Sequence, residues 1–121
     1  MNRIRWILGV AVASALVVLL AAPVTNARPA SAQATSVTVK MKEFKFILSK
    51  TTVHHGKVTF TVINIGKINH DFKINGKKTP SIAPGKRAKL VVTFTTAGRY
   101  RYLCVIGQHW KFGMKGVLKV T

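Results

Sequence analysis

The chain has 121 residues, of which 20 are Lys or Arg and 2 are Asp or Glu, so its formal charge is +18 with neutral histidines. This length is enough for one domain. A single cysteine excludes an intramolecular disulfide, an iron–sulfur cluster held by thiolates of one chain and a dinuclear copper centre with two thiolates. Two carboxylates leave little room for a glycosidase pair or an EF-hand.

Residues 1–32 are typical of a secretory signal peptide. Arg3 and Arg5 precede an apolar run over residues 7–22, and the small residues Ala30-Ser31-Ala32 follow it. The apolar run is shorter than the roughly 20 residues of a comfortable membrane-spanning helix. We therefore expect a signal helix that is cleaved near Gln33, with retention as an N-terminal anchor as the alternative. The mature protein is predicted to be soluble and exported, either periplasmic or extracellular, or held at the outer face of the cytoplasmic membrane if the segment stays attached.

After a short linker at residues 33–36, a single domain is predicted over residues 37–121. Apolar and polar residues alternate in several short segments, which is the pattern of half-buried strands. Turn residues such as Asn75-Gly76 and Pro84-Gly85 separate these segments. The pattern predicts an all-β antiparallel sandwich or barrel with no helix of useful length. The residues expected to face its interior include Val37, Val39, Met41, Val58, Phe60, Val62, Leu90, Val92, Phe94, Leu118 and Val120.

Four residues form a candidate metal site: His70, Cys104, His109 and Met114. The last three follow a Cys-x4-His-x4-Met spacing, which lets one loop after a strand supply a thiolate, an imidazole and a thioether. His70 would come from a different strand. This donor set matches a trigonal His2Cys copper site with a long axial Met, whereas zinc normally takes another His, Cys or carboxylate instead of Met. One copper ion is therefore the predicted cofactor.

The segments NHDF, YLC and GMKG around these ligands resemble the small blue copper proteins, the cupredoxins related to plastocyanin, amicyanin and azurin. The resemblance covers the whole predicted domain. It implies a Greek-key β-sandwich of about seven to eight strands with one type 1 copper, Cu(I)/Cu(II), at one end. It also implies that His70 and His109 bind copper through Nδ1, with the edge of the His109 ring near solvent.

Three positions depart from the pattern of that family. The family commonly has Asn after the first His ligand and a hydroxyl residue after the Cys, a pair that ties the ligand loops together. Here these positions hold Asp71 and Val105, and Gly107 stands where many relatives have Pro. Asp71 is expected to accept hydrogen bonds from backbone N–H groups or to pair with a nearby Lys.

The resemblance implies an exported, non-enzymatic one-electron carrier that works between redox partners. A copper-delivery or copper-resistance protein would use the same ligands, and a metal-free adhesion domain is a third reading. A multicopper oxidase or copper nitrite reductase is disfavoured, because four histidines cannot supply the additional copper sites that such enzymes have.

The net charge and several side chains indicate how the protein would bind its redox partners or a membrane. Removing residues 1–32 leaves 17 Lys and Arg against 2 carboxylates, a charge of +15 on 89 residues. We expect this charge to steer encounter with an acidic redox partner or an anionic membrane surface, and we expect a monomer that does not bind nucleic acid. Trp110 and Phe112 either pack over the end of the sandwich or form an apolar docking rim, and His54-His55 is expected in an exposed turn.

Overall fold

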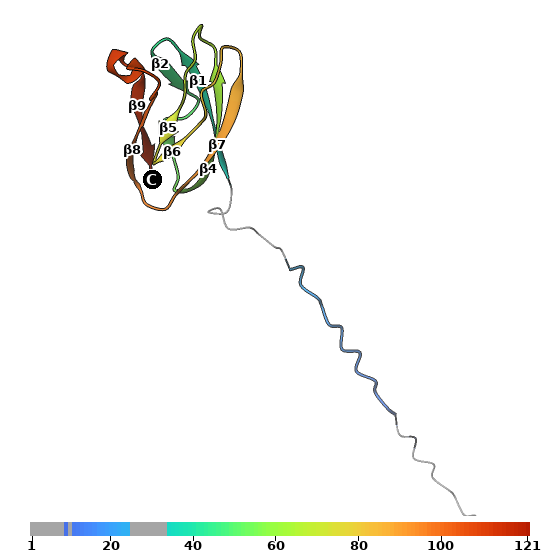
Figure 1. Cartoon of the computed structure of the whole chain (residues 1–121). Helices are drawn as coiled ribbons and strands as arrows, with labels where there is room; N and C mark the ends of the chain where they lie inside the picture. Colours follow the sequence, from blue (N-terminus) through green and yellow to red (C-terminus); the bar gives the residue numbers. More distant parts are fainter. Residues whose placement is uncertain (1–8, 10, 25–33) are drawn as a thin grey trace, which may run out of the picture.

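The protein is described by a computed structural model that covers residues 9, 11–24 and 34–121. Residues 34–121 form a β-sandwich (Figure 1). Its described strands are β1 (Thr35–Lys42), β2 (Lys45–Leu48), β3 (Thr52–Val53), β4 (Gly56–Asn64), β5 (Lys73–Ile74), β6 (Lys77–Lys78), β7 (Arg87–Phe94), β8 (Gly98–Leu103) and β9 (Lys115–Val120), with a short 3-10 helix, η2 (His109–Phe112), between the last two.

These strands build two sheets, with the orders β2-β1-β4-β7 and β3-β9-β8-β5-β6. The prediction of an all-β sandwich is confirmed, with nine strands described in residues 34–121 where seven to eight were expected. The difference comes from β3, β5 and β6, which have two residues each and are too short to show an alternating pattern.

The prediction of a purely antiparallel arrangement is wrong. β1 pairs in parallel with β4, and β3 pairs in parallel with β9, while the other strand pairs are antiparallel. Alternation of apolar residues reports which face of a strand is buried and carries no information about the direction of its neighbour. The parallel pairing also lengthens β1, which begins at Thr35, two residues before the expected start of the domain.

The core lies between the two sheets and is built from the alternating side chains that the sequence pattern indicated. On β1 and β4, every second side chain is buried. Burying such a side chain contributes about 1.5–3 kcal/mol. The buried cluster comprises Val37, Val39, Met41, Phe46, Val53, Val58, Phe60, Val62, Phe72, Ile74, Ile82, Val92, Phe94, Tyr102, Cys104, Met114, Leu118 and Val120.

Two predicted turns have the backbone geometry that their residues favour. Asn75 and Gly76 have φ values of 49° and 73° and join β5 to β6. Gly85 has φ 76° and Lys86 N–H donates to the Ala83 carbonyl at 3.0 Å, which is the type II turn expected of Pro84-Gly85. These turns fix the ends of the strands around the loop that carries His70.

Within the N-terminal segment, residues 9 and 11–24 are described and form no helix, so the expected N-terminal signal helix is not seen in them. Their side chains are exposed, as Leu16 shows, and an isolated helix of this length is marginal in water without packing against a core. Residues 1–8, 10 and 25–33, including the expected cleavage site near Gln33, lie outside the described residues. No helix among the described residues is long and apolar enough to cross a membrane.

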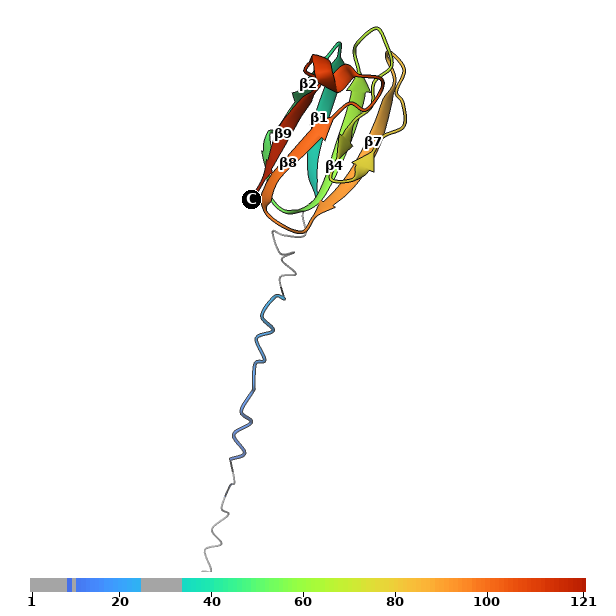
Figure 2. The same cartoon turned by 60° about the vertical axis from the view of Figure 1, so that its left-hand side comes forward.

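The sandwich has two distinct ends (Figures 1 and 2). β1 begins near the end where the chain terminates, and η2 lies at the opposite end. The loops after β4 and β8 meet at the η2 end, and the candidate ligands lie there.

Candidate metal centre

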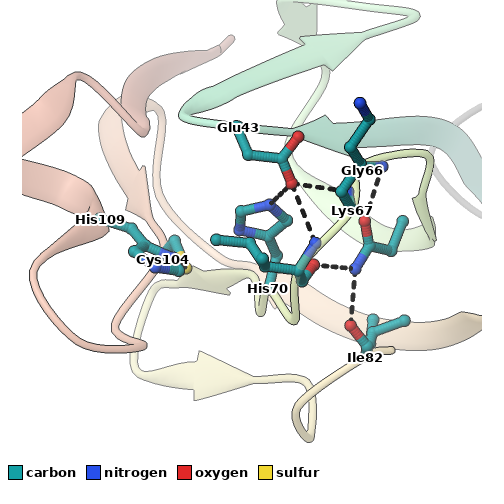
Figure 3. Close-up of polar contacts among 9 residues, drawn as sticks. Glu43, Gly66, Lys67, His70, Ile82, Cys104 and His109 are labelled. Carbon is teal, nitrogen blue, oxygen red and sulfur yellow. Dashed lines mark hydrogen bonds and ion pairs between the residues drawn. The ribbon is translucent and has the colours of Figure 1, made fainter. Parts of the chain in front are cut away.

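The loop that follows β4 positions His70. The Asn64 side chain, buried at the end of β4, donates from Nδ2 to the carbonyls of Ile68 at 2.8 Å and Ile82 at 2.7 Å, and its Oδ1 accepts from Gly66 N–H at 2.9 Å (Figure 3). His70 and Ile82 exchange backbone hydrogen bonds of 3.2 and 2.8 Å. One buried amide thus holds both segments that flank the imidazole.

The His70 ring is fully buried and presents one nitrogen toward the other candidate ligands. Its Nε2 lies 3.2 Å from Glu43 Oε1. Since an ionised carboxylate can only accept, Nε2–H is the donor, and Nδ1 carries the lone pair. Nδ1 is buried and has no hydrogen-bond partner among the described residues. An unsatisfied buried acceptor of this kind costs about 1–3 kcal/mol unless something binds to it, so its retention indicates a ligand atom.

Cys104 and His109 lie next to this nitrogen. Cys104 follows directly after β8, and its Sγ lies 3.6 Å from His109 Nδ1. The candidate donor atoms of His70, Cys104 and His109 all lie within 4.8 Å of one another, with the first two residues buried and His109 half-buried. Burial raises the pKa of the Cys104 thiol, which therefore needs a strong competitor for its proton. Three predicted ligands therefore meet at one point.

The loop between β8 and β9 closes the site by backbone hydrogen bonds. Cys104 N–H donates to the Met114 carbonyl at 3.1 Å, and Met114 N–H donates to the His109 carbonyl at 3.3 Å. Gly107 and Gly113 have φ values of 53° and 104°, in the left-handed region that favours glycine. Proline, with φ near −65°, cannot take the conformation of Gly107, which explains why glycine stands there.

The Met114 side chain is fully buried, and its backbone is hydrogen-bonded to the backbones of Cys104 and His109. The structure brings its backbone to the other ligands. Its role as the weak axial ligand stays a prediction.

A hydrogen bond joins the two ligand loops even though Asp71 and Val105 differ from the residues that the family commonly has at these positions. Asp71 is 3% exposed, and its Oδ1 accepts from the Val105 backbone N–H at 2.7 Å. Of the two partners expected for Asp71, the structure therefore shows the backbone N–H. Because the donor belongs to the backbone, the residue after Cys104 needs no hydroxyl group.

The turn between β1 and β2 contributes two residues that the sequence analysis missed. Glu43 Oε1 accepts from Lys67 N–H at 2.7 Å and from Ile68 N–H at 3.0 Å as well as from His70 (Figure 3). These bonds, the one from Lys67 first, lower the pKa of Glu43 to about 2, so it is ionised. The Phe44 ring lies edge-on to the His109 ring, with centroids 5.1 Å apart.

Gly66 allows this approach of the carboxylate. A Cβ atom at position 66 would lie 2.5 Å from Glu43 Oε1. The scarcity of carboxylates could have pointed to Glu43, since both carboxylates of a very basic chain turn out to bond the ligand loops.

Other singled-out side chains lie at the expected places. Trp110 and Phe112 are 40% and 67% exposed on η2, and Phe112 packs against Phe44 with centroids 5.1 Å apart. His54 and His55 are exposed, and their Nδ1 atoms lie 3.0 Å from Thr121 Oγ1 and 2.9 Å from Thr121 O. The two turn histidines therefore contact the C-terminal residue and do not belong to the cluster of His70, Cys104 and His109.

The donor set fits copper. A thiolate with two imidazoles is the trigonal set of type 1 copper, and the unpartnered Nδ1 of His70 is aligned for it by a carboxylate bonded to the opposite ring nitrogen. A zinc site would normally add another His, Cys or carboxylate. The nearby carboxylates, Glu43 and Asp71, are instead engaged by backbone N–H groups and His70.

Comparison with known families agrees with this geometry. The profile of the cupredoxin-like domain matches residues 11–120. The chain belongs to the cupredoxin-like family. Its fold and its His-Cys-His cluster identify it as a blue copper protein with one copper ion.

Solved cupredoxins share the fold at low sequence identity. Reduced auracyanin from Roseiflexus castenholzii superposes with a TM-score of 0.62 at 20% identity, covering 72% of this chain and 97% of that one. Auracyanin A, a "blue" copper protein from Chloroflexus aurantiacus, gives 0.60 at 17% identity, covering 74% and 100%.

Multicopper oxidases match only in part. The oxidase of Staphylococcus epidermidis is 37% identical over 68 residues, which are 55% of this cupredoxin and 15% of the oxidase. The chain thus spans about 15% of the length of the curated relatives it matches.

Proposed function

We propose that this cupredoxin is an exported one-electron carrier that receives an electron from one redox protein and passes it to another, without catalysing a reaction of its own. The copper ion supplies the one-electron chemistry by cycling between its cuprous and cupric states. What supports this function is the cluster of donor atoms from His70, Cys104 and His109, together with the buried, unpartnered Nδ1 of His70. Contacts from residues outside the cluster fix these side chains.

Fixed ligands suit fast electron transfer, because little has to move when the charge changes. Glu43 holds the His70 ring, Asp71 ties the His70 segment to Val105 beside the thiol, and Phe44 packs on the His109 ring. Glu43 and Phe44 come from the β1–β2 turn, and the bond from Val105 to Asp71 joins the two loops that carry Cys104 and His70. The chain's own residues therefore set the site geometry.

We infer that the electron leaves through His109. Of the three clustered ligands, His70 and Cys104 are buried, while His109 is half-buried at the start of η2. The exposed Trp110 and Phe112 follow it on the same helix. An apolar rim next to a partly exposed ligand is suited to brief docking of a partner, since apolar contacts need no exact charge pairing.

The excess of positive charge supports steering toward an acidic partner. Two small redox reagents of opposite charge test it. The electron-transfer rate with anionic hexacyanoferrate should fall as salt is added, and the rate with a cationic cobalt complex should rise. Rates that respond equally to salt with both reagents would remove steering from the proposal.

Repeated redox cycling tests the carrier function. Copper-loaded protein is reduced with ascorbate and reoxidised with hexacyanoferrate, and copper is measured after each cycle on desalted protein. We expect the visible band to return fully with the metal retained. Loss of copper to an added acceptor without redox turnover would indicate a delivery protein instead. Asp71→Asn keeps all the candidate ligands and an acceptor for Val105 N–H, so this control variant should cycle and retain copper as the wild type does.

A further inference from the structure

Both carboxylate side chains are used at the copper end. Asp71 is buried and accepts a hydrogen bond from Val105 N–H, and Glu43 accepts hydrogen bonds from two backbone N–H groups and from His70. Within residues 34–121, the side-chain ion pair that the structure describes joins Glu43 to His70, and no Lys or Arg there has a carboxylate partner. The surfaces of both sheets therefore carry cations without any acidic side chain to offset them.

The outer face of the five-stranded sheet places some of these cations directly opposite one another. In the strand register, Arg99 lies directly opposite Lys119, and Lys73 lies directly opposite Lys78. Directly opposite residues have Cβ atoms about 4.5–5.5 Å apart, and like charges there destabilise a sheet. We call this surface the basic face; its exposed cations are Lys73, Lys78, Arg99, Arg101, Lys115 and Lys119.

The four-stranded sheet carries a similar number of cations in a different arrangement. Lys57 lies opposite Thr93, and Lys89 lies opposite Thr61, so both of these cations have an uncharged cross-strand neighbour. Lys42 and Lys45 form its like-charged pair, and they flank the β1–β2 turn. Each sheet thus has one like-charged pair that flanks a turn, and the basic face has in addition the Arg99–Lys119 pair between its inner strands β8 and β9. A binding partner that supplies anions would relieve the repulsion in this pair.

The side chains of the basic face favour a lipid surface over a folded protein. A protein interface is built around buried aromatic or other large apolar anchors. On the basic face the exposed large apolar side chain is Val117, whereas the exposed aromatic rings in the described residues, Trp110 and Phe112, lie on η2. A row of Lys and Arg with few apolar anchors matches the phosphate groups of an anionic bilayer, to which each cation near the surface adds about fivefold in binding constant.

We propose that the basic face binds the anionic phospholipid headgroups of a membrane, with β8 and β9 lying along the bilayer. In Figure 2 these two strands lie on the near side of the molecule and η2 lies at one end of them. Binding through this face leaves His109 and the η2 rim free at the edge of the bound protein. The inference deepens the proposed carrier function, on which its purpose rests: it keeps the carrier beside membrane-bound redox partners.

Vesicle binding tests the proposal without any electron transfer. Copper-loaded protein is sedimented with vesicles of phosphatidylglycerol and phosphatidylcholine at about 0.1 M salt, where the Debye length is about 10 Å. Vesicles of phosphatidylcholine measure any binding by the apolar run at residues 7–22, which is subtracted. The double variant R99Q/K119Q removes two charges from the basic face, and K57Q/K89Q removes two charges from the other sheet as a matched control.

We expect R99Q/K119Q to weaken binding to the anionic vesicles about 30-fold and K57Q/K89Q to weaken it less than about threefold. R99Q/K119Q should also unfold at the same or a higher temperature than the wild type, because it removes a repulsive pair. Equal losses in the two variants, or no binding of the wild type, would overturn the proposal. So would binding to soluble polyglutamate that depends on Arg99 and Lys119 when vesicle binding does not, since this would assign the face to an acidic protein. Redox cycling measured separately on the same variants tells a failure of this proposal from a failure of the carrier function.

Discussion

Replacing Asp71 tests the link between the two ligand loops. The carboxylate is 3% exposed and accepts one short hydrogen bond, 2.7 Å long, from Val105 N–H. A hydrogen bond to a charged group contributes about 1.5–3 kcal/mol, and its loss also leaves the donor of Val105 without its acceptor. Asp71→Ala should therefore lower the free energy of unfolding of the copper-free protein by about 2 kcal/mol. For a domain of this size that corresponds to a fall in Tm of about 8–16 °C.

Asp71→Asn is the matched control. Its amide oxygen can still accept from Val105 N–H, as a neutral hydrogen bond, so we expect a loss below about 1 kcal/mol. The assay is urea unfolding of the copper-free proteins followed by tryptophan fluorescence, because bound metal would add stability of its own. An alanine variant as stable as the wild type, or an asparagine variant as unstable as the alanine variant, would refute the proposed link.

Three further predictions concern the copper end. Gly66→Ala places a Cβ against Glu43 Oε1 and should lower copper affinity by roughly tenfold in a chelator competition, whereas unchanged affinity would show that Glu43 does not orient His70. Because the pKa of Glu43 is about 2 in the fold and 4.5 ordinarily, its contribution to stability is present above pH 4.5 and is lost as the pH falls toward 2; urea unfolding between pH 5 and 2.5 should show a loss that Glu43→Gln lacks. Since burial raises the pKa of the Cys104 thiol, copper binding should release its proton and tighten as the pH rises, which isothermal titration in buffers of different ionisation enthalpy can measure; binding without proton release would contradict this.

Much of the fold and two of the candidate ligands, Cys104 and His109, could be predicted because their cues are local. Alternation on β1, β4 and β7 identified the buried faces, and the spacing of Cys104 and His109 placed two donors in one loop. His70 was identified by residue type, since the other two members of the cluster, Cys104 and His109, lie more than 30 residues away in the chain. The chemical types of the donor groups then favoured copper over zinc, which required no structure.

The contacts that hold the ligands could not be predicted, because each joins distant segments. Glu43 is 27 residues from His70, and no sequence pattern indicates that the β1–β2 turn reaches the loop after β4. The bond from Val105 to Asp71 uses a backbone donor, which every residue except proline has, so residue type cannot reveal it. The direction of β1 against β4 is likewise a property of the chain's path and not of either strand.

The visible absorption spectrum on addition of cupric ion is the most direct test of the copper site. We predict an intense thiolate-to-copper band, blue or green, at one copper per chain, and its disappearance in Cys104→Ala with the fold retained by circular dichroism. A colourless protein with bound copper, or a band that persists in the Cys104→Ala variant, would contradict the site built from His70, Cys104 and His109.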